Sequence, residues 1–271
     1  MFPWEEIKDL VSFVTYKNEG ETPLEALERL RREKGIAQGE SMTYAGRLDP
    51  MAEGLLLILV GEECKNKTEY LGLDKEYEVE VLLGVGSDTG DILGMVDCDT
   101  FEGEGNIKIS KEMIQGSIQE EIKLLIGKRS EKYPVYSSRT VNGKPLFAHA
   151  REGGLGDIEV PAKEIEIYSI DFISLEEIET KTIIETAIER IAKVKGDFRQ
   201  NDVVRSWNLL KDKLGAAKVG DVKTRNSFSV VSLRVRSSSG AYMRTLAEKL
   251  GASLGVKSLA LKIKRTKIVG Y

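Results

Sequence analysis

The stretch MTYAGRLDPMAEGLLLILVGEE, residues 42–63, places an aspartate close to a long apolar segment. Asp49 precedes Pro50, and an unbroken apolar run follows at 55–60. The run is short and has glycines on both sides, so it predicts a buried strand rather than a helix. An aspartate before a proline is usually a turn or helix-start residue, and local propensity alone favours that role here. Whether Asp49 does chemistry depends on the rest of the chain.

The composition is that of a soluble globular protein with room for a sizeable core. Of 271 residues, 41% are hydrophobic and 31% are charged. The longest purely apolar run has six residues, whereas a helix that crosses a bilayer needs roughly 20. The start, MFPWEEIKDL, lacks the basic and apolar parts of a signal peptide. We therefore expect a cytoplasmic protein with no membrane partner, and we take it to be a monomer.

The cysteine and histidine content restricts the chemistry. Cys64 and Cys98 are the only cysteines, and their spacing suggests neither a disulfide framework nor a metal motif. His149 is the only histidine, which argues against metal sites built from several imidazoles and against nucleophiles that a histidine activates. We expect no metal site, and a chemistry that depends mainly on carboxylates, tyrosines and arginines.

The distribution of charge is uneven along the chain. The net charge of −4 argues weakly against a nucleic-acid partner. Residues 231–271, however, contain nine Lys or Arg against the single acid Glu248, a local balance of +8. This segment predicts that one end of the molecule is suited to polyanions.

The periodicity predicts mixed helices and strands without regular β-α-β alternation, which is typical of an α+β fold. The capping-box pattern at Thr22 and Glu25 predicts a helix at 23–34. In KEYEVEVLLG, residues 75–84, the alternation predicts a strand with Tyr77 on its apolar face. Further helices are expected at 110–127, capped by Ser110, and at 182–195, 202–214 and 241–254, further strands at 164–172, 228–236 and 259–269, and irregular structure at 130–160.

The pattern Gly46-Arg47-Leu48-Asp49-Pro50 before a buried strand resembles the catalytic motif of pseudouridine synthases. These enzymes detach uracil from its ribose within RNA, rotate it, and rejoin it through carbon 5. Further stretches, in the right order, resemble the TruB-type branch, which modifies uridine 55 in the T-loop of tRNA. They are YKNEGETPLEALERLRR (16–32), KEYEVEVLLGVGSDTGDILG (75–94), YPVYSSRTVNGKPLFAHAREG (133–153), SSSGAYMRTLAEKLGASLG (237–255) and IKRTKIVGY (263–271).

The resemblance implies a role for four residues. It puts the catalytic carboxylate at Asp49, the active-site tyrosine at Tyr77, the paired arginine at Arg244 and an apolar base-packing residue at Ile263. A carboxylate that attacks a ribose carbon or the base must be ionised, and a nearby guanidinium favours that form and fixes its direction. From the residues alone, simpler roles prevail: a core aromatic for Tyr77, a helix-surface cation for Arg244 and packing for Ile263.

Contacts to the RNA follow from the same resemblance. The base must be flipped out of a folded loop to be reached, and Tyr44 stands where these enzymes usually carry a histidine that helps to extrude it. Cations around the site are candidates to hold the neighbouring phosphates, with a solvated surface role as the open alternative for each. These candidates are Arg47, Arg139, Lys144, Arg151 and, in the basic end of the chain, Arg265.

The chain also departs from the family pattern. Arg47 replaces a small residue, Ile263 stands where leucine is more usual, and Asn18-Glu19 interrupts a Lys-Pro-x-Gly turn. Residues 174–227 form an extra, helical insertion that we expect to pack on a single catalytic domain. The sequence stops at Tyr271, where many relatives continue into a PUA RNA-binding domain, so none is expected. Arg-Leu-Asp also occurs in the RluA-type branch, but the tyrosine strand and the Gly-x-Tyr-x-Arg helix suit the TruB type better.

Together these patterns predict a pseudouridine synthase fold built on a mixed, largely antiparallel sheet, with a cleft between the Asp49 loop and the Arg244 helix. The reaction implied is isomerisation of uridine without a cofactor, in the T-stem-loop of tRNA. Two alternatives stay open. One is a non-catalytic protein that binds or folds tRNA on the same scaffold, and the other is a pseudouridine synthase that acts on a different RNA.

Overall fold

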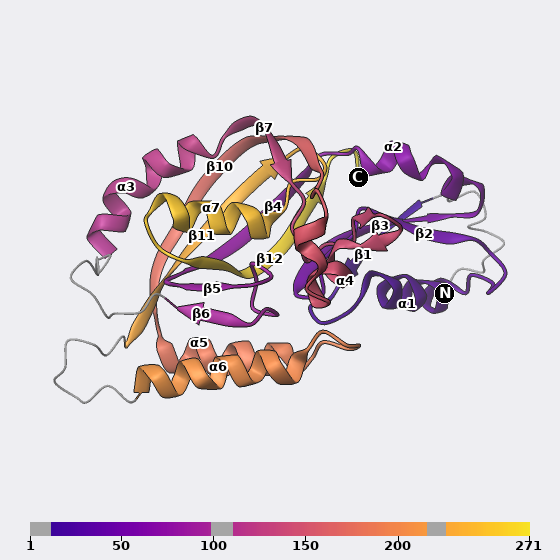
Figure 1. The fold of residues 1–271 in the computed structure, drawn as a ribbon. Helices are drawn as coiled ribbons and strands as arrows, with labels where there is room; N and C mark the ends of the chain where they lie inside the picture. Colours follow the sequence, from indigo (N-terminus) through magenta and orange to yellow (C-terminus); the bar gives the residue numbers. More distant parts are fainter. Residues whose placement is uncertain (1–11, 99–110, 216–225) are drawn as a thin grey trace.

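One mixed sheet forms the centre of the structure. The computed structural model describes residues 12–98, 111–215 and 226–271. Within them, an eight-stranded sheet has the order β1-β3-β12-β4-β11-β10-β7, with β2 paired to β3 (Figure 1). Only β3 and β12 pair in parallel among these described strands, which confirms a mixed, largely antiparallel sheet. The strands are β1 (Ser12–Lys17), β2 (Met42–Ala45), β3 (Ala52–Val60), β4 (Lys75–Leu83), β7 (Gly127–Lys132), β10 (Ala162–Glu179), β11 (Ser227–Ser237) and β12 (Ser258–Ile268).

Helices and short hairpins surround this sheet. Helices α3 and α7 share a core with β4, β10, β11 and β12, and α5 and α6 lie side by side beyond the β5–β6 hairpin (Figure 1). The helices are α1 (Pro23–Lys34), α2 (Lys67–Leu71), α3 (Lys111–Leu124), α4 (Leu146–Arg151), α5 (Thr180–Ile191), α6 (Gln200–Gly215) and α7 (Met243–Ser253). The short strands are β5 (Val85–Ser87), β6 (Val96–Cys98), β8 (Thr140–Val141) and β9 (Lys144–Pro145), and short 3-10 helices lie at Gly61–Asn66 and Gly154–Asp157.

Most predicted elements are confirmed, and two predictions need correction. The interval 130–160, predicted to be irregular, contains the β8–β9 hairpin and α4, which are too short to produce a clear periodicity. Strand β10 is twice as long as predicted, because its last residues, SLEEIE, alternate less regularly and yet pair with β11. The predicted cap of α3, Ser110, lies outside the described residues. None of the helices in the described part of the chain combines the length and apolar character of a membrane span.

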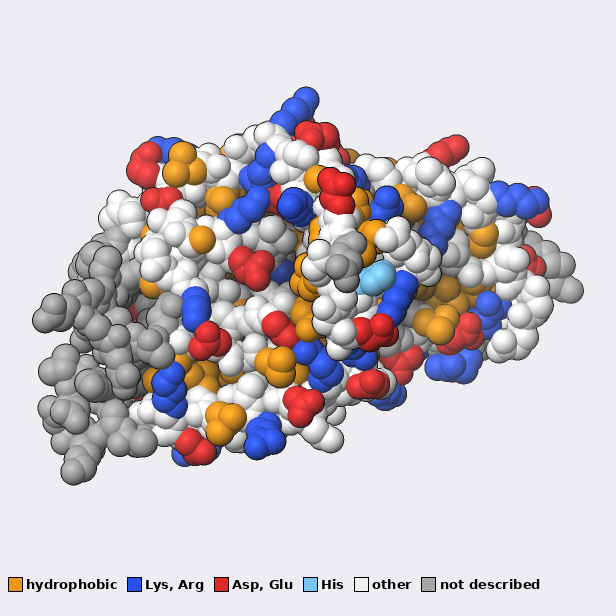
Figure 2. Space-filling view, viewed as in Figure 1, with side chains coloured by type: hydrophobic (Ala, Val, Ile, Leu, Met, Phe, Trp, Pro, Cys, Tyr) orange, Lys and Arg blue, Asp and Glu red, His pale blue; other side chains and the backbone are white. Residues whose placement is uncertain are grey.

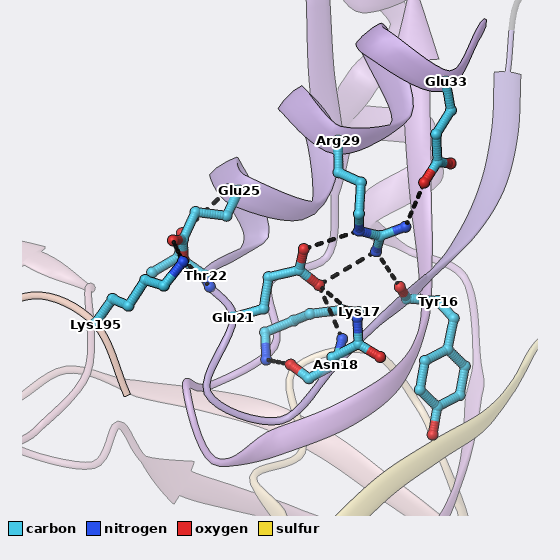
Figure 3. A network of polar contacts seen from close by, with 9 residues as sticks. All are labelled: Tyr16, Lys17, Asn18, Glu21, Thr22, Glu25, Arg29, Glu33 and Lys195. Atoms are coloured by element: carbon cyan, nitrogen blue, oxygen red, sulfur yellow. Dashed lines mark hydrogen bonds and ion pairs between the residues drawn. The ribbon is translucent and has the colours of Figure 1, made fainter. Parts of the chain in front are cut away.

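The start of α1 follows directly from its capping box. The Thr22 hydroxyl accepts a hydrogen bond from the Glu25 amide at 3.1 Å, and the Glu25 carboxylate accepts one from the Thr22 amide at 2.8 Å. Pro23 occupies the first helical turn, and Gly35 ends the helix with a left-handed φ of 67°. Figure 3 shows Glu25 bonded to Thr22 and also facing Lys195, which comes from the turn after α5.

A close backbone contact joins β3 to β12 beside the Asp49 loop. Gly54 has a φ of +116°, and a Cβ at this position would lie 2.2 Å from the Arg265 carbonyl oxygen. Only glycine fits such a contact. In the resulting parallel register, Ala52 is opposite Ile263 and Gly54 is opposite Arg265. The strand that follows Asp49 is therefore paired with Ile263 and Arg265 of β12, close to the Asp49 loop.

The α5–α6 hairpin builds a second core against the sheet. Buried residues of both helices pack with Leu82 of β4, Leu259 of β12 and Phe228 of β11. Trp207 of α6 is fully buried, and its indole Nε1 donates a hydrogen bond to the Ile92 carbonyl at 3.1 Å. The first and last residues of the predicted helical insertion belong instead to β10 and β11, which carry the hairpin at their ends.

Trp207→Phe is expected to lower the free energy of unfolding by about 1–3 kcal/mol, because phenylalanine leaves the buried Ile92 carbonyl without its donor. Urea denaturation followed by circular dichroism would measure the loss. The matched control is Leu209→Ala on the same helix, where the side chain is 59% exposed and the change should stay within about 0.5 kcal/mol. Equal stability of Trp207→Phe and the wild type would contradict this account of the second core.

Candidate active site

An ion pair joins Asp49 to Arg244. Asp49 lies in the loop between β2 and β3, and Arg244 lies in the first turn of α7. The Arg244 Nε donates a hydrogen bond to the Asp49 Oδ2 at 2.8 Å. The Arg244 side chain is 4% exposed, whereas that of Asp49 is 33% exposed. The pair therefore presents an oriented, accessible carboxylate backed by a buried cation.

The remaining donors of Arg244 are also bound. Its Nη1 donates to the Thr89 carbonyl at 2.6 Å and its Nη2 to the Tyr136 carbonyl at 3.2 Å. Burial lowers the pKa of the guanidinium, but the carboxylates of Asp49 and Asp91 outweigh this and raise the pKa above its usual value. Arg244 is thus a fixed positive charge with one geometry.

Asp91 is a buried carboxylate behind this pair, and the sequence analysis did not single it out. Its Oδ1 accepts hydrogen bonds from the Thr89 hydroxyl at 2.7 Å and the Leu93 amide at 3.0 Å. Its Oδ2 lies 3.9 Å from the Arg244 Nε. Burial raises the pKa of Asp91, and Arg244 opposes that effect. Asp91 lies within the stretch 75–94 that resembles the TruB-type branch, but no local feature of the sequence separates this buried carboxylate from a solvated one.

A cavity of about 270 Å³ opens beside Asp49. Two residues predicted from the sequence, Tyr77 of β4 and Ile263 of β12, line it together with Asp49. Tyr242, just before α7, also lines it, and burial together with the nearby Asp49 raises the pKa of this phenol. The cavity combines aromatic and apolar walls with one carboxylate.

Basic side chains form another part of this wall. Arg265, predicted to hold a phosphate, is 1% exposed. Its Nε donates to the Leu55 carbonyl at 2.6 Å and its Nη2 to the Gly46 carbonyl at 3.1 Å. Its guanidinium therefore braces the backbone on both sides of Asp49. Lys75, which the sequence analysis did not consider, lines the same cavity, and burial, Arg265 and Lys163 lower its pKa to about 8.

A second cavity, of about 490 Å³, lies on another side of Asp49. Tyr44, Arg47 and Arg151 line it, so the structure brings three more predicted residues to the site. The Arg47 Nη2 donates to the Tyr44 hydroxyl at 3.0 Å, and Arg151 donates to the Asp197 carbonyl at 2.8 Å. These contacts hold the cations at the cavity edge.

Two predicted cations do not line either cavity. The Arg139 guanidinium lies 5.2 Å from the centre of the Tyr133 ring. Lys144 forms an ion pair with Glu152. Neither of them is among the residues that surround Asp49.

The balance of +8 counted along residues 231–271 overstates the unpaired positive charge of this segment, and its suitability for polyanions stays a prediction. Seven of its nine cations are buried or paired with carboxylates from other strands and loops, which local charge along the sequence does not reveal. Figure 2 shows Lys and Arg side chains interspersed with Asp and Glu on one face. Arg244 and Arg265 are buried, and the pairs are Arg234–Glu78, Lys249–Glu131, Lys257–Asp97, Lys262–Glu53 and Lys267–Glu76.

Lys17 supports the Asp49 loop from inside the protein. It is fully buried, and its Nζ donates to the carbonyls of Asn18, Pro50 and Ala52 at 3.0, 3.2 and 2.5 Å. Figure 3 shows the bond to Asn18. Burial lowers the pKa of Lys17 to about 8, against the opposing effect of Glu21 and other carboxylates. Lys17 therefore fixes the backbone on both sides of residue 51.

The pKa of Lys17 predicts a pH dependence of stability. Because the Lys17 pKa of about 8 in the folded state lies below the ordinary lysine value of 10.5, the unfolded chain binds more protons between these two pH values. Stability should therefore rise with pH in that window. Lys17→Met should remove up to roughly 3 kcal/mol of this rise. Urea denaturation of both proteins from pH 7.5 to 9.5 measures the difference. Parallel curves for the two proteins would rule out the lowered pKa.

Comparison with solved structures shows which known folds this chain resembles. The fold is similar to that of a chain in the crystal structure of a Cbf5-Nop10-Gar1 complex. The TM-score is 0.55 at 15% identity, and the match covers 98% of this chain and 51% of the other chain. The fold is also similar to an H/ACA ribonucleoprotein bound to a substrate RNA containing 2′-deoxyuridine, with a TM-score of 0.51 at 14% identity over 98% and 50%. These likenesses show that the chain shares the fold of those proteins.

Comparison of sequences defines the family. Residues 34–190, more than half of the chain, match the TruB family pseudouridylate synthase N-terminal domain, so the chain belongs to the TruB family. It is 26% identical to tRNA pseudouridine synthase B of Ralstonia pickettii over 89% of this chain and 58% of the relative. It is 36% identical to tRNA pseudouridine synthase B of Thermosipho melanesiensis over 58% of this chain and 47% of that relative. The chain spans about half the length of the curated relatives that it matches.

Proposed function

We propose that this chain isomerises uridine to pseudouridine in RNA, with position 55 in the T-loop of tRNA as the target. The observation that carries the proposal is the oriented Asp49 carboxylate, bonded to the buried Arg244 at 2.8 Å and bordering a cavity with Tyr77 and Ile263 in its wall. The relatives named tRNA pseudouridine synthase B support tRNA as the substrate.

Each group of the site has a role in the proposed reaction. Asp49 attacks the ribose or the base, and the N1–C1′ bond breaks. The freed uracil turns, its C5 bonds to C1′, and the bond between the substrate and the Asp49 oxygen breaks, which returns the carboxylate. The C5 proton leaves and N1 gains a proton, so that the overall change is an isomerisation. Tyr77 and Ile263 hold the base between an aromatic and an apolar surface while it turns. Tyr242, whose pKa is raised, stays protonated and is available as a donor.

The RNA must present a flipped nucleotide, because a stacked base cannot reach a cavity wall. Arg47 is exposed and lines both cavities, which makes it the first candidate for a phosphate next to the target. Lys163 lines the smaller cavity. Burial lowers the pKa of its ammonium group, and the positive charge of Arg139 lowers it further. Charged contacts of this kind position the RNA without reading its sequence.

The test is incubation with unmodified tRNA transcripts, without added metal or cofactor, followed by chemical mapping of pseudouridine. One new modification at position 55 is the expected result. Modification only at other positions would support an enzyme with a different RNA substrate. Binding without modification of any RNA would support a non-catalytic RNA-binding protein instead.

Asp91→Asn is expected to slow turnover about tenfold, or about 1.4 kcal/mol, because the amide keeps the shape but no longer attracts Arg244. Single-turnover rates with excess protein would measure the effect, and the affinity for tRNA should not change. Asp97→Asn, at a 68% exposed side chain paired with Lys257, is the matched control. A full wild-type rate in Asp91→Asn would show that Arg244 needs no support from Asp91.

A further inference from the structure

The turn between α5 and α6 reaches the larger cavity beside Asp49. Asp197, Phe198 and Arg199 of this turn line that cavity together with Asp49. The two helices themselves cover the second core, where Trp207 is buried. The hairpin therefore extends from a structural core to the site, and its turn forms one wall of the cavity.

Hydrogen bonds hold this turn in one conformation. The Gln200 Oε1 accepts from the Phe198 amide at 2.9 Å, and the Gln200 Nε2 donates to the carbonyls of Val194 and Gly196 at 3.1 and 2.7 Å. Arg199 has a φ of 59°, which a residue with a side chain rarely adopts. Non-glycine residues held in this left-handed conformation are concentrated at active sites and ligand-binding sites.

The turn is also fixed to the segment that precedes α1. Arg190 forms an ion pair with Glu19 at 2.6 Å, and both side chains are less than 15% exposed. Gly20 has a φ of +81°, and a Cβ there would lie 2.8 Å from the Lys193 carbonyl oxygen. The Gly20 amide in turn donates to the Pro50 carbonyl at 2.9 Å, next to Asp49. The Asn18-Glu19 departure from the family turn thus provides the attachment point for the hairpin.

The cavity wall has the chemistry of a nucleotide site. Four aromatic residues line it: Tyr44, Tyr136, Phe147 and Phe198. Phe147 is 38% exposed. The Arg199 guanidinium lies 4.7 Å from the centre of the Tyr136 ring and bonds to Asp88 at 2.8 Å. Aromatic rings next to arginines bind unpaired nucleobases and their phosphates.

The two cavities share a wall. Both are lined by Arg47, Leu48, Asp49, Ser137 and Ser138. Two ligands that occupy them at the same time are therefore neighbours on either side of this wall, as two successive nucleotides of one RNA strand would be.

We propose that the larger cavity is a second nucleotide subsite, in which the base next to the target uridine stacks on aromatic side chains, and that the α5–α6 turn makes this subsite through Phe198 and Arg199. The proposal rests on the proposed function, since the target uridine occupies the smaller cavity. The hairpin is then a determinant of substrate choice as well as a part of the core.

The test compares T-stem-loop RNAs that are intact or abasic at the nucleotide on the 5′ or the 3′ side of the target. With wild-type protein in excess, one abasic RNA should react at least tenfold more slowly, as expected for the loss of one stacked base. Phe198→Ala should slow the intact RNA about tenfold and lose little more with that abasic RNA. Phe147→Ala should show the same two effects as Phe198→Ala. Because the Phe147 side chain is exposed, we expect no folding defect in this variant. Leu209→Ala on α6 is the control and should match the wild type.

The outcomes separate this proposal from the proposed function. Formation of pseudouridine in the intact RNA by the wild type supports the proposed function by itself. If the wild type then converts intact and abasic RNAs at equal rates, or if Phe198→Ala and Phe147→Ala both keep the wild-type rate, the second subsite is wrong while the reaction stands. If the wild type forms no pseudouridine in any of these RNAs, the proposed function fails, and this proposal fails with it.

Discussion

Asp49→Asn is expected to abolish pseudouridine formation, with a loss of roughly 10⁴-fold or more. Asparagine is nearly isosteric and still offers an oxygen to the Arg244 Nε, which lies 2.8 Å from the carboxylate. It carries no negative charge and is a poor nucleophile, so the step that breaks the N1–C1′ bond loses its driving group. Single-turnover conversion of tRNA transcripts would measure the loss.

Two measurements separate loss of chemistry from loss of structure in this variant. The midpoint of thermal unfolding and the dissociation constant for tRNA should both stay close to the wild-type values, because the Asp49 side chain is one-third exposed. The acid-to-amide control Asp97→Asn lies outside both cavities and should keep full activity. Substantial turnover by purified Asp49→Asn protein would remove Asp49 from the mechanism.

Arg244→Met should remove turnover and also destabilise the fold by about 3–5 kcal/mol, because it leaves the buried Asp91 carboxylate without its cation. Burial already raises the pKa of Asp91 while Arg244 opposes the rise, so the variant should raise it further. A carboxyl whose folded pKa exceeds the unfolded value is most favourable at low pH, and that contribution is lost as pH rises through the folded pKa. The stability deficit should therefore be smaller at pH 5 than at pH 8.

Urea denaturation at both pH values would measure this deficit. Arg244→Lys serves as the comparison, since it keeps the charge but cannot reproduce the three bonds to Asp49, Thr89 and Tyr136. It should recover part of the stability and little of the activity. An equal deficit for Arg244→Met at pH 5 and pH 8 would mean that Asp91 does not depend on this cation.

Local patterns were enough to predict most of the fold. The capping box at Thr22 and Glu25 predicts the bounds of α1 correctly, and the apolar alternation predicts β4 and the inward side of Tyr77. The end of β10 was missed because its exposed glutamates follow no clear alternation. Pairing with β11 stabilises that segment, and a single segment of sequence does not contain its partner.

The candidate site was predicted only in part, for a related reason. Motifs identify residues that act directly, and the structure brings Asp49, Tyr77, Arg244 and Ile263 together. They do not identify Asp91, because nothing in the local pattern distinguishes a buried carboxylate from a solvated one. The same limit applies to the basic residues at 231–271, whose acidic partners come from distant strands. Charge counted along the chain is a poor guide to charge on the surface.

The position of β12 between β3 and β4 has a consequence for the order of folding. In the sheet order, β12 is the strand that connects the pair β1–β3 to the block β4-β11-β10-β7. The bond from the Arg265 Nε to the Leu55 carbonyl joins residues 210 positions apart. Strand β12 pairs with β3 only at residues 52–54, whereas it pairs with β4 along most of its length, so the junction with β3 is the weaker one. We expect the half with Asp49 and the half with Tyr77 to become ordered first and the site to assemble when β12 docks, so that catalytic competence should appear together with the slowest folding phase.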